Sequence, residues 1–552
     1  CEGLTELNLT DNVYIEGFNV IFRSCGNLSR IQVSETSPFY TTVDGVLYNK
    51  DITTIIFFPD GYTKEYELPM TIKKIAAGVF ENKQNLRKIT ITKNVELIDT
   101  LAFKGCKNLR DLLFEDGGTE DLIIGDGAFQ LCYALTDVVL PDRTKRIGSD
   151  AFSMDRYYND SLKSITLNNG LEIIGANAFY RTGIKEITIP YTVQKIGSGA
   201  FIGSLLETIT FEETPKTDAN GNAITPVPLA FETAKINSKK VEVFVPNSTG
   251  MFLSCEGLKR IVLPERLEYI PSGTFQGCSA IEYVYIPSTV QNSTVYNYSG
   301  SSKNTKVRAI GDKAFSGCFN LNTVEFAKGG TAPLSFGNEA FAGCEALTIL
   351  NLPNRIASVN TALLDVFQRK TTSVSTLKYN VVSFGSSYDN DTKAYRTCGI
   401  TTINVEEGGA EYASYDGVLY TSGLKSVVFC PYEREGAVRV SYKAETFEKF
   451  AFGGCYKISE IIFDETPEGE TPVDFELKSI KDPVGSYSNY ESVFYGCISL
   501  KSIAFPSRLT AIGDYALARN TDTEKNNAIQ SVTFADGCKI KSIGAGAFKN
   551  SG

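Results

Sequence analysis

The chain has 552 residues, of which 42% are hydrophobic and 21% are charged, and its formal net charge is −10. This acidic balance argues against a nucleic-acid partner, because nucleic-acid binding depends on clustered lysine and arginine. The chain contains no histidine, which excludes a Ser-His-Asp triad, a Cys-His dyad and any zinc site that uses imidazole. No apolar run approaches the roughly 20 residues that a membrane-spanning helix needs.

The first local pattern in chain order is a hairpin signal at residues 40–48. An Asp-Gly pair, Asp44-Gly45, stands there between two extended runs, and this arrangement is typical of a β-hairpin. The same phrase returns at residues 412–420. Two copies indicate longer coils that continue a repeated stack, and they indicate a higher-order duplication of the chain.

A phrase with a period of 23 residues runs through most of the sequence. Its fullest copy is I-G-x-x-A-F-x-x-C-x-x-L-x-x-V-x-L-P at residues 124–141. A period of this length predicts one supersecondary unit that is stacked many times, so that neighbouring units share a continuous core. The pairs that stand 23 residues apart include Phe80 and Phe103, Phe129 and Phe152, Phe252 and Phe275, and Phe494 and Leu517.

Each part of the repeated phrase predicts a local structure. The V-x-L alternation before Pro141 is strand periodicity, and the proline ends the strand because it cannot donate to a ladder. Ile124 marks a second, shorter segment that points inward, and the Gly125 that follows it suits a tight turn where a Cβ would clash. A cysteine three residues after Phe129 fits one short helical turn. We therefore expect a β-rich coil with short helical corners.

The thirteen cysteines follow the repeat. Most of them stand three residues after the phenylalanine position, so we interpret this slot as a stacking position filled by small, buried thiols. A few disulfides are the alternative, although the odd total favours thiols, and the lack of any C-x-x-C pair argues against zinc. The cysteines in this slot are Cys1, Cys25, Cys106, Cys132, Cys255, Cys278, Cys318, Cys344, Cys455 and Cys497.

The period is broken in several places. We predict insertions near residues 157–161, 212–240, 291–306 and 464–490, because the spacing of the phrase lengthens there or loop-forming residues gather there. At residues 355–410 little of the phrase remains, and we expect an irregular junction or a kink. Insertions in solenoids usually lie along one edge and often serve binding.

The phrase I-G-x-x-A-F-x-x-C-x-x-L-x-x-I-x-L-P resembles the BspA-type leucine-rich repeats of bacterial and protozoan surface proteins. The resemblance covers most of the chain, from Cys1 to Gly552. It implies a right-handed leucine-rich-repeat superhelix of the α/β horseshoe class. We expect residues 1–552 to form one continuous solenoid that is truncated at both ends, because the chain begins and stops inside a repeat.

The outward positions of the main strands form the candidate binding surface. In leucine-rich repeats the strand sheet lines the concave side, and tyrosine and arginine are frequent hot-spot residues. Tyrosine also offers an apolar ring with a polar tip, which suits a sugar. A plain solvated β-surface is the alternative, because threonine and tyrosine are good strand formers. The candidate ligand-binding residues are Arg260, Tyr283, Tyr285, Thr323 and Glu325.

The resemblance implies a non-catalytic, adhesin-like protein that is secreted or displayed at the cell surface. Members of the family are associated with attachment to extracellular-matrix proteins, to host cells or to other microbes. A glycan-binding surface module and a passive spacer that displays another domain are the alternatives. Acidic pairs such as Glu212-Glu213 and Glu406-Glu407 could in principle serve a glycosidase, but acidic pairs in loops are usually solvated charge. We therefore predict no enzyme activity, no cofactor and no metal.

Overall fold

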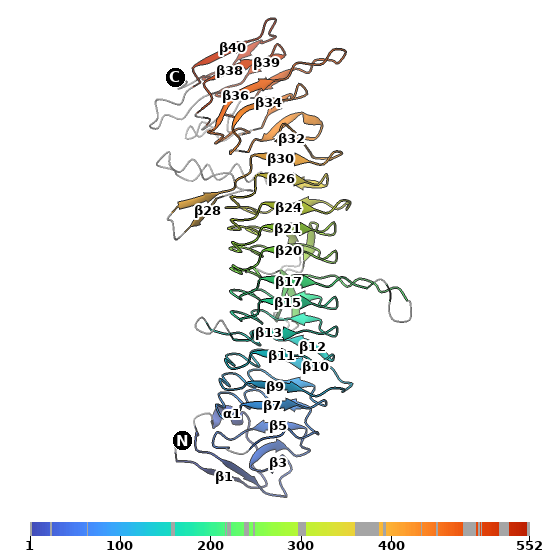
Figure 1. Cartoon of the computed structure of the whole chain (residues 1–552), viewed down its shortest axis with the longest axis vertical. Helices are drawn as coiled ribbons and strands as arrows, with labels where there is room; N and C mark the ends of the chain where they lie inside the picture. Colours follow the sequence, from blue (N-terminus) through green and yellow to red (C-terminus); the bar gives the residue numbers. More distant parts are fainter. Residues whose placement is uncertain are drawn as a thin grey trace. The chain divides into compact units, whose positions relative to one another are not determined.

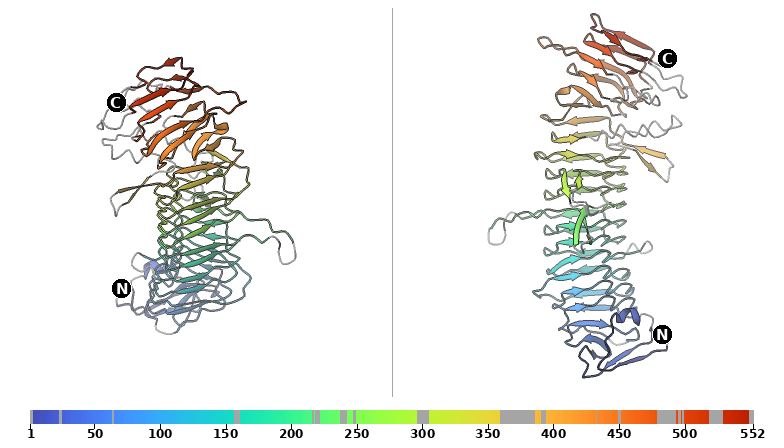
Figure 2. Two further views of the ribbon diagram at one scale, coloured as in Figure 1. Left: turned by 45° about the horizontal axis from the view of Figure 1, so that its top comes forward. Right: turned by 180° about the vertical axis from the view of Figure 1, so that it is seen from behind.

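The computed structural model divides into two compact units, residues 1–279 with 294–306 and residues 280–293 with 307–552, and each is described by itself. Strands dominate both units (Figures 1 and 2). No helix in the described part of the chain has the length and apolar character needed to cross a membrane. The structure describes residues 3–22, 25–62, 65–155, 161–215, 217, 222–236, 242–246, 249–295, 305–358, 386–389, 394–431, 433–448, 451–478, 493–494, 497, 499–517 and 529–548.

In the first unit, successive coils contribute strands to two rows. We call the row of main strands the first strand row. Its strands run parallel in the pairs β1–β2, β7–β9, β11–β13 and β15–β17. The row contains β1 (Glu6–Leu9), β2 (Arg30–Val33), β7 (Lys88–Ile91), β9 (Asp111–Phe114), β11 (Asp137–Val139), β13 (Ser164–Thr166), β15 (Glu186–Ile189), β17 (Thr208–Phe211) and β20 (Arg260–Val262).

The second strand row of this unit is one nine-stranded sheet in the order β16-β14-β12-β10-β8-β6-β5-β4-β3. The isoleucine that precedes the Gly corner, such as Ile124 or Ile147, lies in this row and is fully buried, which confirms the predicted second inward segment. The strands of this row are β3 (Tyr40–Val43), β4 (Val46–Asn49), β5 (Thr54–Phe57), β6 (Lys74–Ile75), β8 (Leu97–Ile98), β10 (Leu122–Ile124), β12 (Thr144–Ile147), β14 (Ile173–Ile174) and β16 (Lys195–Ile196). The unit also contains the one-turn helix α1 (Phe18–Ile21).

A column of stacked phenylalanine rings forms the core of the first unit. Successive ring centroids lie 4.8–5.9 Å apart, and their planes differ by at most 22°. These rings occupy the repeated Phe position, so the 23-residue period is the distance along the chain between neighbouring layers. The column consists of Phe80, Phe103, Phe129, Phe152, Phe179, Phe201, Phe252 and Phe275.

The second unit has the same two-row construction. Its first strand row contains the parallel pairs β21–β24, β26–β30, β34–β36 and β38–β40. These strands are β21 (Tyr283–Ile286), β24 (Thr323–Phe326), β26 (Ile349–Leu352), β30 (Thr402–Val405), β34 (Gly436–Val440), β36 (Ile458–Phe463), β38 (Ser502–Phe505) and β40 (Ser531–Phe534). Its second strand row includes β25 (Leu334–Ser335), β27 (Ile356–Ser358), β33 (Ser426–Phe429), β35 (Thr446–Phe447), β37 (Phe475–Leu477), β39 (Leu509–Ile512) and β41 (Ser542–Ile543).

Both predicted Asp-Gly hairpins are confirmed. In the first unit β3 and β4 pair across Asp44-Gly45, and in the second β31 (Tyr412–Tyr415) and β32 (Val418–Thr421) pair across the equivalent turn, which the short helix η4 (Ser422–Leu424) follows. The two residues at each tip have positive φ, as a type I′ turn requires. Each tip glycine carbonyl accepts a hydrogen bond from a strand of the first row, at 3.1 Å from Ile31 and 2.9 Å from Ile403. The hairpin therefore also covers the edge of that strand.

The insertions leave the stack and return to it. In the first unit a hairpin of β18 (Glu232–Ile236) and β19 (Glu242–Pro246) lies between Phe201 and Phe252, whose rings still stack at 5.4 Å. In the second unit β26 and β30 pair in register, although most of the predicted junction at residues 355–410 separates them in sequence. Within that junction the structure describes a hairpin of β28 (Ser386–Asp389) and β29 (Ala394–Thr397). Two further short strands are β22 (Ser293–Val295) and β23 (Thr305–Val307). Of the predicted irregular segments, 156–160, 218–221, 237–241, 296–304, 359–385, 390–393 and 479–490 lie outside the described residues.

The Gly after the second-row isoleucine is required by contact between coils. A Cβ on Gly175 would lie 2.4 Å from the backbone of Gly148 and Ser149, and one on Gly148 would lie 2.5 Å from the backbone of Gly125 and Asp126. Neither glycine has a positive φ, so the cause is the closeness of the preceding coil and not a left-handed backbone. This observation refines the expectation of a tight turn.

Replacing Gly175 by alanine should therefore separate two coils locally. We expect a loss of about 1–3 kcal/mol in unfolding free energy, because the methyl group meets fixed backbone atoms. Chemical denaturation measures the change. Gly26→Ala is the matched control, since a Cβ at Gly26 has nothing within 4 Å, and an equal effect of the two substitutions would contradict the explanation.

The cysteine slot forms a ladder of thiol hydrogen bonds. The Sγ atom of Cys106 donates to the Phe80 carbonyl at 2.9 Å, and that of Cys132 donates to the Phe103 carbonyl at 3.2 Å. Cys344 donates in the same way in the second unit. All twelve described cysteines are thiols and eleven are buried, which agrees with the predicted stacking role. Each of these thiols is a second donor to a carbonyl that already accepts a backbone N–H of its own corner, as the Phe80 carbonyl does from Lys83.

These thiols should resist alkylation in the folded protein. Burial raises the pKa of Cys106 to about 12 and the pKa of Cys132 well above its usual range, so at pH 8 both remain protonated and inaccessible. Cys538 is only partly buried and should react. Peptide mass spectrometry after iodoacetamide treatment measures this difference, with denatured protein as the fully labelled control. Rapid labelling of Cys106 or Cys132 in the folded protein would refute it.

Four buried arginines stabilise turns at the ends of the main strands. Each stands two residues after a proline, as Arg143 follows Pro141, and none is more than 8% exposed. Arg143 donates from Nη2 to the Thr92 carbonyl at 3.2 Å and from Nη1 to the Val95 carbonyl at 2.5 Å, and so reaches back across the coil in between. The set consists of Arg143 and Arg266 in the first unit and Arg355 and Arg508 in the second.

Replacing Arg143 by methionine should cost about 2–4 kcal/mol of unfolding free energy. The substitution keeps most of the apolar stem but leaves buried carbonyl oxygens without their charged donor. Arg110→Met is the control, because Arg110 is exposed. Thermal and urea unfolding of both variants measures the difference, and a loss below about 0.5 kcal/mol for Arg143→Met would show that the turn does not need the guanidinium.

Candidate functional site

The outward side chains of the first strand row form a continuous surface in the first unit. Alternate residues of each strand are exposed while the residue between them is buried, as in Arg260, Ile261 and Val262 of β20. Arg260 is thus on the predicted surface, next to the exposed Val262. Several outward positions in the same row are apolar and exposed, among them Leu113 and Val139. This surface offers both charge and apolar area.

The other four predicted residues lie together in the second unit. β21 and β24 pair in parallel, with Tyr283 opposite Thr323 and Tyr285 opposite Glu325. The Tyr283 hydroxyl donates to the Glu325 Oε2 atom at 2.5 Å, a diagonal contact that joins the two strands. Both tyrosines are partly buried, whereas Thr323 and Glu325 are exposed. Sequence analysis identified this grouping but not the hydrogen bond that orders it.

The same surface continues over the next pair of strands of the second unit. β26 and β30 place Ile349 opposite Thr402 and Asn351 opposite Asn404. The Asn404 Nδ2 atom donates to Asn351 Oδ1 at 2.9 Å, and the Ile349 side chain is 50% exposed. The Asn404 contact could not be found from spacing, because little of the repeated phrase remains at residues 355–410, which include β30.

The described residues contain no group of three or more histidine, cysteine, aspartate or glutamate side chains that could hold a metal ion. The acidic pairs noted in the sequence have structural contacts instead. Glu212 accepts a hydrogen bond from the Tyr191 backbone at 3.4 Å, and Glu406 accepts one from the Asn354 backbone at 3.4 Å. These carboxylates cap turns of the preceding coil.

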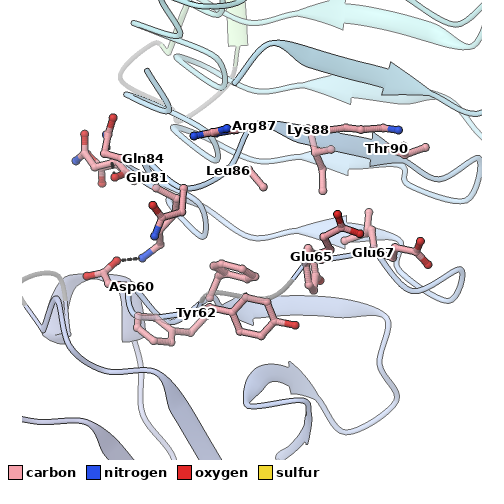
Figure 3. A pocket seen from close by; sticks show the side chains of 18 of the residues that line it. Asp60, Tyr62, Glu65, Glu67, Glu81, Gln84, Leu86, Arg87, Lys88 and Thr90 are labelled. Atoms are coloured by element: carbon pink, nitrogen blue, oxygen red, sulfur yellow. Dashed lines mark hydrogen bonds and ion pairs between the residues drawn. The ribbon is translucent and has the colours of Figure 1, made fainter. Parts of the chain in front are cut away.

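A cleft in the first unit was not predicted from the sequence. It has a volume of about 880 Å³ and separates the segment 65–68 from β7. Figure 3 shows Glu65 and Glu67 on one wall, with Lys88 and Thr90 on the wall opposite. Segment 65–70 carries the Y-x-L-P pattern of a main strand, so its sequence alone predicts direct pairing with β7, and the opening is a property of the folded coils.

The partly buried Tyr66 lines this cleft and contacts the buried Tyr48. The Tyr66 and Tyr48 hydroxyls lie 3.0 Å apart, and the Phe58 ring packs edge-on against Tyr66 at 5.0 Å. Burial raises the pKa of Tyr48 to about 12 and the pKa of Tyr66 well above its usual range. Both hydroxyls therefore remain neutral, and the cleft has a largely aromatic base beneath a charged rim.

Parallel strand rows, a regular coil length and a buried column of repeated side chains define a leucine-rich-repeat protein. A family profile described as the BspA type leucine rich repeat region matches it in six copies. The matches cover most of the sequence, so the chain belongs to the BspA-type leucine-rich-repeat family. The matched residues are 56–156, 153–223, 229–305, 299–415 and 445–552.

Solved structures similar to this chain include a leucine-rich repeat protein from Bacteroides ovatus, with 19% identity, coverage of 92% of this chain and 90% of that one, and a TM-score of 0.42. Another is a leucine rich cell surface protein from Faecalibacterium prausnitzii, with 18% identity, coverage of 83% and 88%, and a TM-score of 0.30. The pneumococcal vaccine antigen PcpA has 15% identity, coverage of 74% and 71%, and a TM-score of 0.31. No curated protein sequence matches the chain.

Proposed function

We propose that this chain is a non-catalytic, adhesin-like protein, secreted or displayed at a cell surface, that binds protein ligands through the first strand row. The observation that carries this proposal is the ordered outward face of the second unit, where Tyr283 is hydrogen-bonded to Glu325 and Asn404 to Asn351. Side chains held by cross-strand contacts lose little entropy on binding. The attachment roles associated with the family support the adhesin-like part of the proposal.

The composition of this face fits a protein partner. Tyrosine is among the residues enriched in binding hot spots, and the exposed Ile349 supplies apolar area between polar neighbours. A typical specific interface covers about 800 Å² on each partner, which several adjacent strands of one row can supply. Extracellular-matrix or cell-surface proteins are therefore the partner class that we propose.

A glycan ligand is the second candidate, favoured by the neighbouring Asn351 and Asn404 amides, which offer donors and acceptors on the same strand row as the two tyrosines. The partial burial of Tyr283 and Tyr285 leaves less ring surface for stacking on a sugar. We therefore rank the protein ligand first. A passive spacer, the third interpretation, would bind neither class.

The test is a binding screen against immobilised extracellular-matrix proteins and a glycan array. For a ligand found there, Tyr283→Ala/Tyr285→Ala should weaken binding at least about tenfold, which corresponds to about 1.4 kcal/mol. The matched control is Tyr133→Ala/Tyr442→Ala, two partly exposed tyrosines outside the first strand row. Undiminished binding by the Tyr283→Ala/Tyr285→Ala variant would exclude this face as the binding site. Absence of binding on both arrays would favour the passive spacer.

A further inference from the structure

The edge of β7 that faces the cleft carries unused backbone groups. β7 pairs with β9 through its odd-numbered residues, because the Arg110 amide donates to the Arg87 carbonyl at 2.9 Å and the Glu115 amide donates to the Ile91 carbonyl at 3.0 Å. Alternate residues of a strand direct their N–H and C=O groups to opposite edges. The backbone groups of Lys88 and Thr90 therefore point into the cleft, and among the described residues they have no hydrogen-bond partner.

The opposite wall of the cleft, segment 65–68, also carries backbone groups that are unpaired among the described residues. Segment 65–68, which leads into Pro69, forms no ladder with any described strand. None of its backbone N–H or C=O groups is hydrogen-bonded within the described part of the chain. Glu65 and Lys88 occupy the same position in consecutive 23-residue repeats, so the two walls belong to neighbouring coils.

Contacts at both ends keep the two walls in place. At one end Lys83 forms an ion pair with Asp60, and its ammonium group also lies 5.6 Å from the centre of the Phe57 ring. At the other end the Asn94 Nδ2 atom donates to the Met70 carbonyl at 2.7 Å. These contacts lie on either side of the opening between the two wall segments, and the four wall residues span about 13 Å.

The base of the slot combines apolar and polar surface. Tyr66, Leu86 and Ile89 line it, and Leu86 and Ile89 are buried. Thr92 also lines the slot with only 3% of its surface exposed, and its Oγ1 atom has no hydrogen-bond partner among the described residues. A buried hydroxyl without a partner is costly, so the slot is suited to a ligand that brings a polar backbone together with apolar side chains.

The charge of the rim selects among such ligands. Five carboxylates and three basic side chains line the slot, and the Lys83–Asp60 pair leaves four carboxylates against two cations. Glu65 and Glu67 lie two residues apart on one face, and within the described residues neither has a hydrogen bond or an ion pair through its side chain. In an extended peptide alternate side chains repeat at about 6.6 Å, so basic residues at alternate positions match this pair.

We propose that this slot binds an extended segment of a partner protein that carries lysine or arginine at alternate positions. The segment enters as an added strand and pairs with the free backbone edges of β7 and of segment 65–68. Main-chain hydrogen bonds then supply affinity, and the acidic rim with the apolar base supplies specificity. The slot volume of about 880 Å³ lies within the range of ligand sites, roughly 300–1,000 Å³. This site is separate from the Tyr283 face and does not depend on it.

The probe is a peptide of about six residues, blocked at both ends, in which lysine alternates with valine. Fluorescence anisotropy with the whole chain should show saturable binding. A peptide with glutamate in place of lysine should bind at least about tenfold more weakly, and so should a peptide N-methylated at its central valine, because it loses a ladder donor. Equal binding of the N-methylated peptide would overturn strand addition.

Variants locate the site. Glu65→Gln/Glu67→Gln should weaken binding of the lysine peptide about tenfold, whereas Glu186→Gln/Glu460→Gln, which changes two exposed strand carboxylates elsewhere, should not. Tyr283→Ala/Tyr285→Ala should leave peptide binding unchanged, so failure at one site is distinguishable from failure at the other. Loss of binding in the Glu186/Glu460 variant to the same degree would show only general attraction to an acidic surface.

Hydrogen exchange tests the backbone edge directly. The Lys88 and Thr90 amides should exchange rapidly in the protein alone and slow at least about tenfold when the lysine peptide is bound. Slow exchange of both amides without peptide would mean that the two walls pair with each other, and it would overturn the proposal. Unchanged exchange in the presence of saturating peptide would overturn it as well.

Discussion

The close contact of one coil with the next at the Gly corner is the constraint on which the rest of this structure depends. Gly175 leaves no room for a Cβ above Gly148, so successive coils stack at strand-ladder spacing and the phenylalanine rings meet face to face, 4.8 Å apart for Phe80 and Phe103. Coils packed this tightly cannot admit water to their corners, so carbonyl groups there need protein donors. The thiol of Cys106 and the guanidinium of Arg143 are such donors, and both follow from the same spacing.

This constraint also determines where variation is tolerated. An insertion is tolerated in a coil only if the residues on either side of it still reach their stacking positions, as Phe201 and Phe252 do in the first unit. The strands β26 and β30 meet the same condition in the second unit, where residue-by-residue pairing resumes after a long insertion. Function is therefore confined to outward side chains and to openings between coils, because the inward residues of every coil are committed to packing.

The repeated positions could be predicted from the sequence because they depend on local spacing. The 23-residue period predicted both strand rows. The Asp44-Gly45 pair predicted its hairpin, because the backbone conformation at a turn is a property of the residues in it. The placement of Tyr283 beside Glu325 required only that equivalent positions of neighbouring repeats lie side by side. The cleft at Glu65 could not be predicted, because its repeat has the same pattern as coils that pair directly. The reach of Arg143 across a whole coil is also a non-local contact, although the proline two residues before each of the four arginines is a signal that could have found it.

The two binding surfaces differ in the physical basis of their recognition. On the strand face of the second unit, β21 and β24 pair with each other in register, and outward side chains such as Tyr285 are the groups offered to a ligand. In the slot beside β7 the backbone itself is the recognition element, and it imposes an extended conformation on whatever binds. A side-chain surface can diverge among repeats without loss of the fold. The slot depends in addition on the contacts on either side of it, Lys83 with Asp60 and Asn94 with Met70. The Thr92 hydroxyl beside the slot has no hydrogen-bond partner among the described residues, and it is the polar group that an incoming strand would satisfy.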